Sequence, residues 1–214
     1  MHPRLTRATG GLAAAVALTA ALTSASLVAT VPAGASSQHR ITVAKSGFSL
    51  ILPNGWNQVS LSSSDLGRVI GSTKDYGNLK AELTTQATNA AAKGLKFFAV
   101  SPPGAPGDFV PNINVGYFSD SGTLAALDGQ IKAIWAKAGA KELVTKNVHL
   151  VPGKAVEGTY ELVAPSSGTT VWETQVYVPH NQLVYIATFS AGSKLAVELT
   201  AAAVMKTFHF TAAA

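Results

Sequence analysis

The sequence of 214 residues contains no cysteine. This absence excludes disulfide bridges, thiolate metal sites and cysteine nucleophiles. It also excludes the lipid-modified cysteine that anchors a bacterial lipoprotein. A domain of this composition must therefore be stabilised by an ordinary hydrophobic core, even outside the cytoplasm.

Charge is scarce as well, because Asp, Glu, Lys and Arg make up only 13% of the residues. The formal net charge is +5, and the lysines are scattered along the chain. Proteins that bind nucleic acid or heparin carry clustered basic residues. We therefore expect no nucleic-acid partner.

Motifs of the common catalytic sites are missing too. The sequence contains no G-x-S-x-G, no H-E-x-x-H and no phosphate-binding G-x-x-x-x-G-K-[ST]. The histidines of the mature chain never lie two or four residues apart, which is the spacing of a preassembled metal site. We expect no metal, no cofactor and no catalytic residues, and hence a protein that is not an enzyme.

One long stretch without charge lies at the N-terminus, from Ala8 to His39. Arg4 and Arg7 precede it, its first half is rich in Ala and Leu, and Ala33-Gly34-Ala35 follows. A positive start, an apolar segment and an A-x-A site are typical of a secretory signal. We interpret residues 1–35 as a cleaved signal; the alternative is an uncleaved N-terminal anchor.

Cleavage after Ala35 leaves residues 36–214, with a net charge of +3 and no remaining transmembrane anchor. The expected location is extracytoplasmic, either secreted or associated with the cell wall. Residues 36–46 are polar and are predicted to be a flexible lead-in. Residues 47–214 are long enough for one hydrophobic core and are predicted to form a single domain.

Hydrophobic patterning predicts alternating strands and helices. The predicted helices span 65–70, 78–93, 124–138 and 194–206. The predicted strands span 48–52, 57–61, 95–100, 109–118, 142–150, 155–163, 169–178 and 183–190. Short links join the last four strands, so we expect antiparallel hairpins.

The apolar stripes of the helices predict how they pack. The stripe of the third helix consists of Leu124, Leu127, Ile131, Ile134, Trp135 and Ala138. In the last helix, Leu195, Leu199, Ala202 and Met205 are predicted to face inward. The strand 183–190 is apolar on both sides, which is typical of a strand with both faces covered. The predicted fold is an α/β/α sandwich, with a mainly antiparallel sheet covered by helices on both faces.

Acidic side chains on consecutive strands form the first candidate site. If the turn 164–168 pairs Val163 with Thr169, then Thr159 lies opposite Glu173. On that register Glu157, Glu161, Glu173 and Tyr177 would share one face of the sheet. Two carboxylates about 6–8 Å apart could act as a glycosidase pair or bind a cation. The plainer alternative is a solvated sheet face.

Apolar residues around a loop form the second candidate site. Trp56, Trp135 and Trp172 occupy predicted inward positions and are assigned to the core; the alternative is that they line a ligand cleft. The loop from Ser101 to Pro111 is rich in Pro and Gly and contains the apolar pair Phe109-Val110, which we expect to be exposed. Phe109 and Val110, with Phe118 on the following strand, are the candidate partner-binding residues.

The opening segment Phe48-Ser49-Leu50-Ile51-Leu52-Pro53-Asn54-Gly55-Trp56 resembles the first hairpin of the PsbP-like superfamily. That superfamily includes a photosystem extrinsic protein, Ran-binding Mog-type proteins and actinobacterial envelope lipoproteins of the LpqN/LpqT type. The similarity continues through the strand 112–118, the helix 124–138, the strands 170–190 and the last helix, which ends at Thr207-Phe208. The Ala-rich composition suits an actinobacterial origin.

The resemblance implies an α/β/α sandwich used for binding, with no shared catalytic residues. Because the lipoprotein cysteine is missing, it does not imply a membrane tether. We therefore expect a secreted, non-enzymatic binding or accessory domain of the bacterial cell envelope, with a protein or a lipid as partner. The alternatives are a small secreted hydrolase that uses the carboxylate-bearing face, and a structural wall-associated protein.

Overall fold

The computed structural model describes residues 40–59, 61, 94–102, 109–120, 122–163 and 169–212. The predicted signal, the start of the lead-in and the predicted helices 65–70 and 78–93 lie outside these residues. So do the middle of the loop 101–111 and the turn 164–168. None of the helices in the described ranges is long and apolar enough to cross a membrane.

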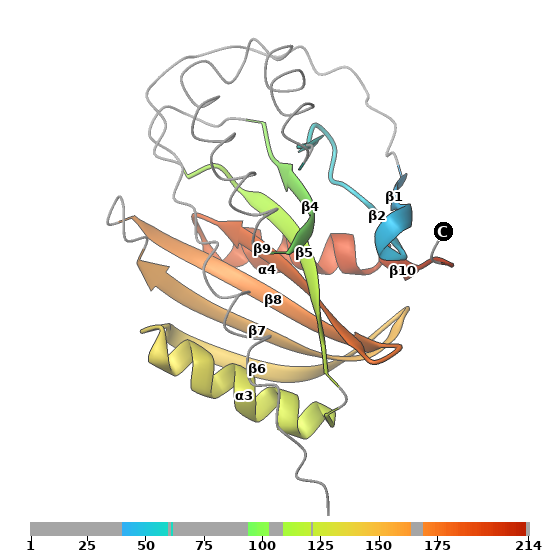
Figure 1. Ribbon diagram of the computed structural model, residues 1–214. Helices are drawn as coiled ribbons and strands as arrows, with labels where there is room; N and C mark the ends of the chain where they lie inside the picture. The colour runs from blue at the N-terminus through green and yellow to red at the C-terminus, as the bar shows by residue number, and fades with distance from the viewer. Residues whose placement is uncertain are drawn as a thin grey trace, which may run out of the picture.

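In the described ranges, seven strands form the main sheet, in the order β3-β4-β5-β9-β8-β7-β6, and every neighbouring pair is antiparallel (Figure 1). The strands are β3 (Asn57–Gln58), β4 (Leu95–Val100), β5 (Asn112–Ser119), β6 (Lys141–Leu150), β7 (Gly153–Val163), β8 (Thr170–His180) and β9 (Leu183–Ala191). The predicted interior strand is β9, which is buried along almost its whole length between β5 and β8.

Helices α3 (Leu124–Lys137) and α4 (Lys194–Met205) lie on opposite faces of this sheet (Figure 1). Thr123 and Ser193 cap their N-termini, each by accepting a hydrogen bond from a backbone amide three residues on. After α3 the backbone of Gly139 takes a φ of +78°, a conformation that glycine adopts without strain. The predicted sandwich with helices on both faces is confirmed.

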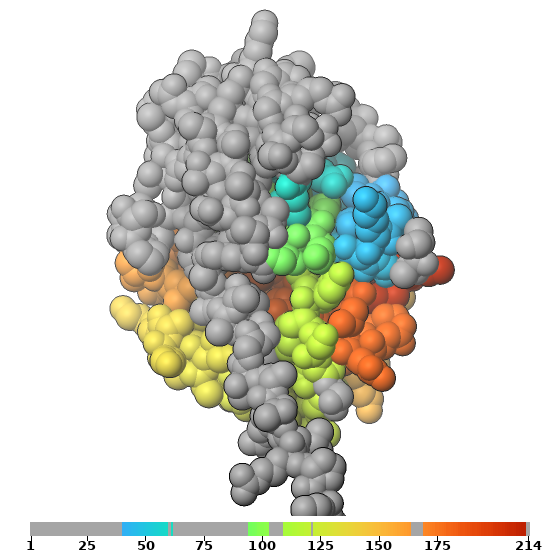
Figure 2. Space-filling model, in the orientation of Figure 1, coloured from blue at the N-terminus to red at the C-terminus, as the bar shows by residue number. Residues whose placement is uncertain are grey.

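A second sheet joins the two ends of the described chain. It has the order β1-β2-β10, formed by β1 (Arg40–Val43), β2 (Phe48–Ile51) and β10 (His209–Phe210). A short 3-10 helix, η2 (Ala44–Ser46), links β1 to β2. Figure 2 shows these N-terminal strands beside the C-terminal part of the chain. The flexible lead-in is therefore wrong for residues 40–46, because Ile41 and Val43 pack on the core while β1 pairs with β2.

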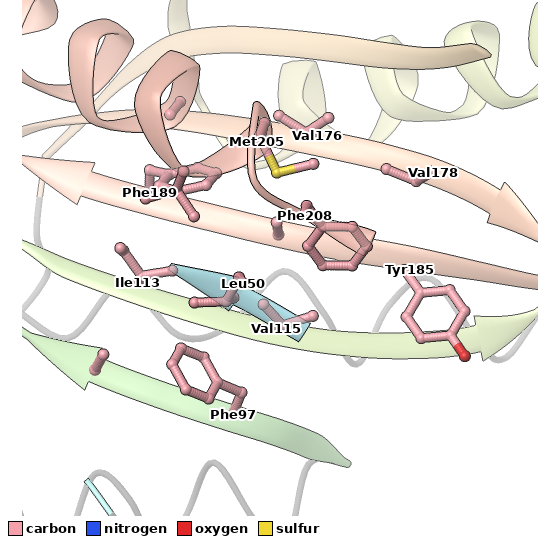
Figure 3. Packing of buried hydrophobic residues seen from close by; sticks show 14 of the residues in the cluster. Leu50, Phe97, Ile113, Val115, Val176, Val178, Tyr185, Phe189, Met205 and Phe208 are labelled. Carbon is pink, nitrogen blue, oxygen red and sulfur yellow. The ribbon is translucent and has the colours of Figure 1, made fainter. Parts of the chain in front are cut away.

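Each face of the main sheet has its own apolar core. On the α4 face, Val176, Val178 and Phe189 pack with Met205 of α4 and with Phe208 (Figure 3). Phe48 belongs to the same core. The residues of α4 in this core are Val197, Ala201, Val204 and Met205. On the α3 face, Leu127, Ile131 and Trp135 pack on β7, β8 and β9. These two cores define the α4 face and the α3 face of the sheet.

The inward face of α4 differs from the prediction. Leu195 and Leu199 are 66% and 62% exposed, and Ala202 is exposed as well, so only Met205 of the predicted stripe is buried. The inward residues Val197, Ala201, Val204 and Met205 lie three and four residues apart, as a helix requires. The helix is thus rotated relative to the predicted orientation, and its two leucines face solvent.

Candidate functional site

The carboxylates of the first candidate site do not share a face. Val163 pairs with Thr170, not with Thr169, so every pair along β7 and β8 is displaced by one residue. Tyr160 therefore lies opposite Glu173, on the α3 face. Because side chains alternate along a strand, a shift of one residue moves them to the other side of the sheet.

The four predicted residues consequently separate into two pairs. Glu157 lies opposite Val176 and Glu161 lies opposite Trp172, so both are on the α4 face. Glu173 and Tyr177 are on the α3 face, where both are buried. The predicted single carboxylate-bearing face is wrong, since the sheet itself separates Glu173 from the other two acids.

Glu157 is already engaged in an ion pair. Its carboxylate lies 2.8 Å from Lys146 Nζ on β6. The hydrogen bond to Glu157 raises the pKa of Lys146, which keeps the ammonium group charged. The pair forms part of the partly exposed surface of the α4 face, near the edge strand β6.

The α3 face carries an unusual set of buried polar side chains in the middle of the sheet. The register places them in two neighbouring rows across β5, β9 and β8. The first row contains Asn112, Ser190 and Glu173, and the second contains Asn114, Thr188 and Gln175. Burying polar groups is costly unless they are hydrogen-bonded. The hydrogen bonds of these six side chains therefore decide how stable this part of the α3 face is.

Glu173 is the only one of the six that can ionise. Its carboxyl oxygens accept hydrogen bonds from Tyr160 OH, at 2.7 Å, and from Ser190 Oγ, at 3.1 Å. Burial raises the pKa of Glu173 above its ordinary value, and the two hydrogen bonds only partly oppose that shift. Burial likewise raises the pKa of Tyr160, so its hydroxyl stays protonated and acts as a donor.

A second chain of hydrogen bonds connects α3 to the same face. Trp135 Nε1 donates to Tyr177 OH at 3.2 Å, and Tyr177 OH donates to Gln175 Oε1. The Trp135 ring also stacks on Tyr160, with a centroid separation of 4.0 Å. Asn114 Nδ2, by contrast, is buried with no hydrogen-bond partner within the described part of the chain.

The residues of the second candidate site do not form an exposed patch. Val110 is 2% exposed, and Phe109 is half-buried and packs against Val171. Phe118 packs partly on the core of the α3 face. The expected exposure of Phe109-Val110 is thus wrong, and the middle of the loop lies outside the described residues.

Phe109→Ala is accordingly expected to lower the free energy of unfolding by about 1–2 kcal/mol, less than for a fully buried ring. Urea denaturation measures the loss. Val151→Ala is the matched control, because Val151 is 62% exposed and its truncation should change stability very little. Unchanged stability together with weaker partner binding would restore Phe109 as a contact residue.

The sequence did not predict an exposed apolar surface on the α4 side of the main sheet. Five large apolar side chains of the described ranges are more than half exposed: Val144, Val151, Val163, Leu195 and Leu199. Four of these, all except Val151, belong to α4 or to the α4 face of β6 and β7. We call these four residues the α4-side patch. The sequence shows the four-residue spacing of Leu195 and Leu199, but this spacing alone does not distinguish a buried stripe from an exposed one.

Contacts of the neighbouring residues show how this patch is arranged. Lys194 Nζ lies 3.8 Å from Glu142 on β6 and 5.1 Å from the centre of the Trp172 ring. Leu195 directly follows Lys194, and one residue rotates a helix by about 100°. Lys194 therefore marks the flank of α4 that turns toward β6, and the exposed leucines lie at least about 100° further round the helix, toward solvent.

Metal binding finds no support in the described ranges, where no three His, Asp or Glu side chains are grouped as ligands. The arrangement thus offers an apolar patch on one side and a closed polar interior on the other. Chemically, the first can bury a partner and the second can hold or release a proton.

The comparisons with solved structures identify the architecture. Yeast Mog1p, a Ran-binding protein of Saccharomyces cerevisiae, superposes with a TM-score of 0.50 at 9% identity, covering 81% of this chain and 95% of Mog1p. The chain has the Mog1p/PsbP-like fold. No family model matches the sequence, and no curated protein does.

Two further structures of this fold are similar. Cyanobacterial PsbP (CyanoP) from Synechocystis sp. PCC 6803 superposes with a TM-score of 0.49 at 13% identity, covering 86% of this chain and 98% of CyanoP. LpqN, involved in cell envelope biogenesis of Mycobacterium tuberculosis, gives 0.43 at 13% identity, with 83% and 87% covered. At such identities the likeness concerns the fold alone.

Proposed function

We propose that this Mog1p/PsbP-like domain is an extracytoplasmic, non-catalytic binding protein that docks a protein partner on its α4-side patch. One observation carries the proposal: of the five large apolar side chains that are more than half exposed in the described part of the chain, four belong to α4 or to the α4 face of β6 and β7. Exposed apolar side chains on one side of a protein, bordered by polar residues, are typical of an interaction surface. The N-terminal secretory pattern supports the extracytoplasmic location.

Charge around the patch favours a protein over a lipid surface. Its margin carries acids and bases in mixture: Lys146 pairs with Glu157, Lys194 approaches Glu142, and Glu198 is exposed next to Leu199. Anionic membranes attract clusters of basic residues, whereas protein interfaces combine an apolar centre with a polar margin of both signs. Mog1p shows that this fold is compatible with protein binding.

The hydrolase alternative is weakened by the register of β7 and β8. Its acids lie on opposite faces, and Glu157 is paired with Lys146. Glu173 is enclosed by Tyr160 and Ser190, so it does not meet a substrate on the surface. A binding role needs neither a carboxylate pair nor an open acid, and it uses the surface that is exposed.

Site-specific photocrosslinking tests the proposal in the producing organism. A photoreactive amino acid at position 199 is expected to give a discrete protein adduct, whereas the same group at position 132, on the solvent side of α3, is expected to give none. In the protein with the photoreactive residue at position 199, Leu195→Asp should reduce the adduct at least about tenfold. The reason is that burying a leucine contributes about 1.5–3 kcal/mol to binding. Intact-mass analysis and gel mobility of the adducts provide the measurement.

The variants are matched so that folding and binding separate. Asp is tolerated in the first turn of a helix, so Leu195→Asp should preserve α4. Ala196→Asp is the control: it is exposed in the same turn but points about 100° away from Leu195, and should leave the adduct intact. The proposal is wrong if position 199 labels only lipid, if both positions label equally, or if Leu195→Asp has no effect.

A further inference from the structure

Glu173 is a buried acid whose charge nothing in the described ranges neutralises. It is 2% exposed, and the groups that act on it are the hydroxyls of Tyr160 and Ser190. Hydroxyls can donate to a carboxylate or accept from a carboxylic acid, so both protonation states can be hydrogen-bonded. Only the ionised state, however, places an uncompensated charge in the interior, where desolvation is costly.

The hydrogen bonds of Glu173 connect it to the packing of α3. The Tyr160 hydroxyl binds Glu173, and the ring of the same tyrosine stacks on Trp135. Trp135, Ile131 and Leu127 are the buried residues of α3. They rest on the core of the α3 face, and β6, one of the strands beneath the helix, is at the edge of the sheet. Loosening Tyr160 therefore loosens the support of α3.

We propose that Glu173 acts as a proton-operated latch for α3, holding the helix on the sheet when it carries its proton and loosening it when the proton is lost. The carboxylic acid and the hydroxyls of Tyr160 and Ser190 form a closed neutral cluster. After ionisation the carboxylate needs water. Displacing α3 admits water from the edge of the sheet, at lower cost than separating the central strands.

Among the described groups that face Glu173, none other changes its charge as the pH rises. Tyr160 on β7 and Tyr177 on β8 are titratable, and burial raises the pKa of both, so both stay neutral. From β9 and β5, Ser190 and Asn112 are uncharged. The inward residues of α3 are Leu127, Ile131 and Trp135. Asp128 on the same helix is partly buried beside β6, where hydrogen bonds to Lys132, at 2.7 Å, and to Thr145 lower its pKa, so it stays ionised while Glu173 responds.

The direction of the effect follows from the raised pKa of Glu173. The closed form favours the protonated acid, so its stabilisation is complete below the ordinary carboxyl pKa. It is lost as the pH rises toward the raised value. Between those two values the equilibrium constant for opening α3 should increase about tenfold per pH unit, and above the raised pKa it should level off.

Amide hydrogen exchange of the folded chain, from about pH 5 to pH 9, measures this opening. The variant Glu173→Gln keeps the shape and cannot ionise. The ratio of exchange rates in α3, wild type over Glu173→Gln, should rise with pH as described. The amides of α4 are the internal control, and there the ratio should stay constant. A ratio in α3 that does not change with pH overturns the proposal, as does an equal change in α4, which would indicate global unfolding.

A second variant keeps the proposal testable if Glu173→Gln fails to fold. Tyr160→Phe retains the ring that stacks on Trp135 and removes the hydrogen bond that lowers the pKa of Glu173. The rise in α3 exchange should then continue to higher pH and reach a higher plateau than in the wild type. An unchanged pH profile in Tyr160→Phe would contradict the latch.

Discussion

Trp135→Ala is expected to lower the free energy of unfolding by about 3–5 kcal/mol, as truncation of a fully buried tryptophan does. Trp135 is 1% exposed and is the only aromatic residue of α3. Its ring stacks on Tyr160, and its indole N–H donates to Tyr177 OH. Alanine leaves a cavity between the helix and the sheet and removes that donor from a buried hydroxyl.

Urea denaturation followed by circular dichroism provides the measurement. Ile134→Ala on the same helix is the matched control, because Ile134 is only partly buried and its truncation should cost about 1 kcal/mol. A loss below about 1 kcal/mol for Trp135→Ala would mean that α3 contributes little to the fold. The stacking on Tyr160 would then have no energetic importance.

The elements that local sequence determines could be predicted. The stripe Leu127, Ile131 and Trp135 has helical spacing, and Thr123 and Ser193, which directly precede the two predicted helices, are residue types that cap a helix. Short links between the last strands correctly predicted antiparallel pairing. The β8–β9 turn is tighter than expected, since Asn181 and Gln182 alone form it, with φ of 49° and 63°. These features depend on a few neighbouring residues, which is why patterning finds them.

The inward side of α4 could not be predicted in the same way. An Ala-rich helix offers two apolar stripes of equal spacing, one through Leu195 and Leu199 and another through Val197, Ala201 and Val204. Because leucine is larger and more apolar than alanine or valine, the sequence favours the first stripe as the buried one. The structure buries the second, where the side chains pack on the core that includes Val176 and Phe189. The choice depends on the tertiary partner, which periodicity does not contain.

The predicted carboxylate-bearing face was wrong because the sequence does not determine the register of β7 and β8. The link between β7 and β8 contains Pro and Gly and can be closed with one residue more or less, and both Thr169 and Thr170 suit the first position of a strand. One extra residue in the link placed Glu173 under α3 and left Glu157 on the opposite face. Side-chain alternation turns such a small error into a change of face for the whole strand. The buried Tyr160–Glu173–Ser190 cluster was therefore invisible without the register.

Phe48→Ala is expected to lower the free energy of unfolding by a comparable amount, about 3–5 kcal/mol, because the substitution removes the aromatic ring that packs between the two sheets. Phe48 is fully buried on β2 of the small sheet. Its ring stacks on Phe208 at 5.4 Å and meets the edges of Phe97 and Tyr185, on β4 and β9 of the main sheet, at 6.4 and 6.1 Å. The ring of Phe48, on the small sheet, therefore contacts residues of the main sheet.

The effect should be shared with Phe208, which directly precedes β10, and not with the strands of the small sheet. In a double-mutant cycle, Phe48→Ala and Phe208→Ala together should cost less than the sum of the single losses, with a coupling of about 0.5–1.5 kcal/mol for a stacked pair. Ile41→Ala on β1, which is only partly buried, is the control and should cost less than about 1.5 kcal/mol. Additive losses for the pair, or equal losses for Phe48→Ala and Ile41→Ala, would show that the sheets are not joined through this ring. The small sheet would then be secured mainly by its backbone pairing and by Arg40, whose guanidinium donates to Ser49 Oγ and to the carbonyl oxygen of Thr207.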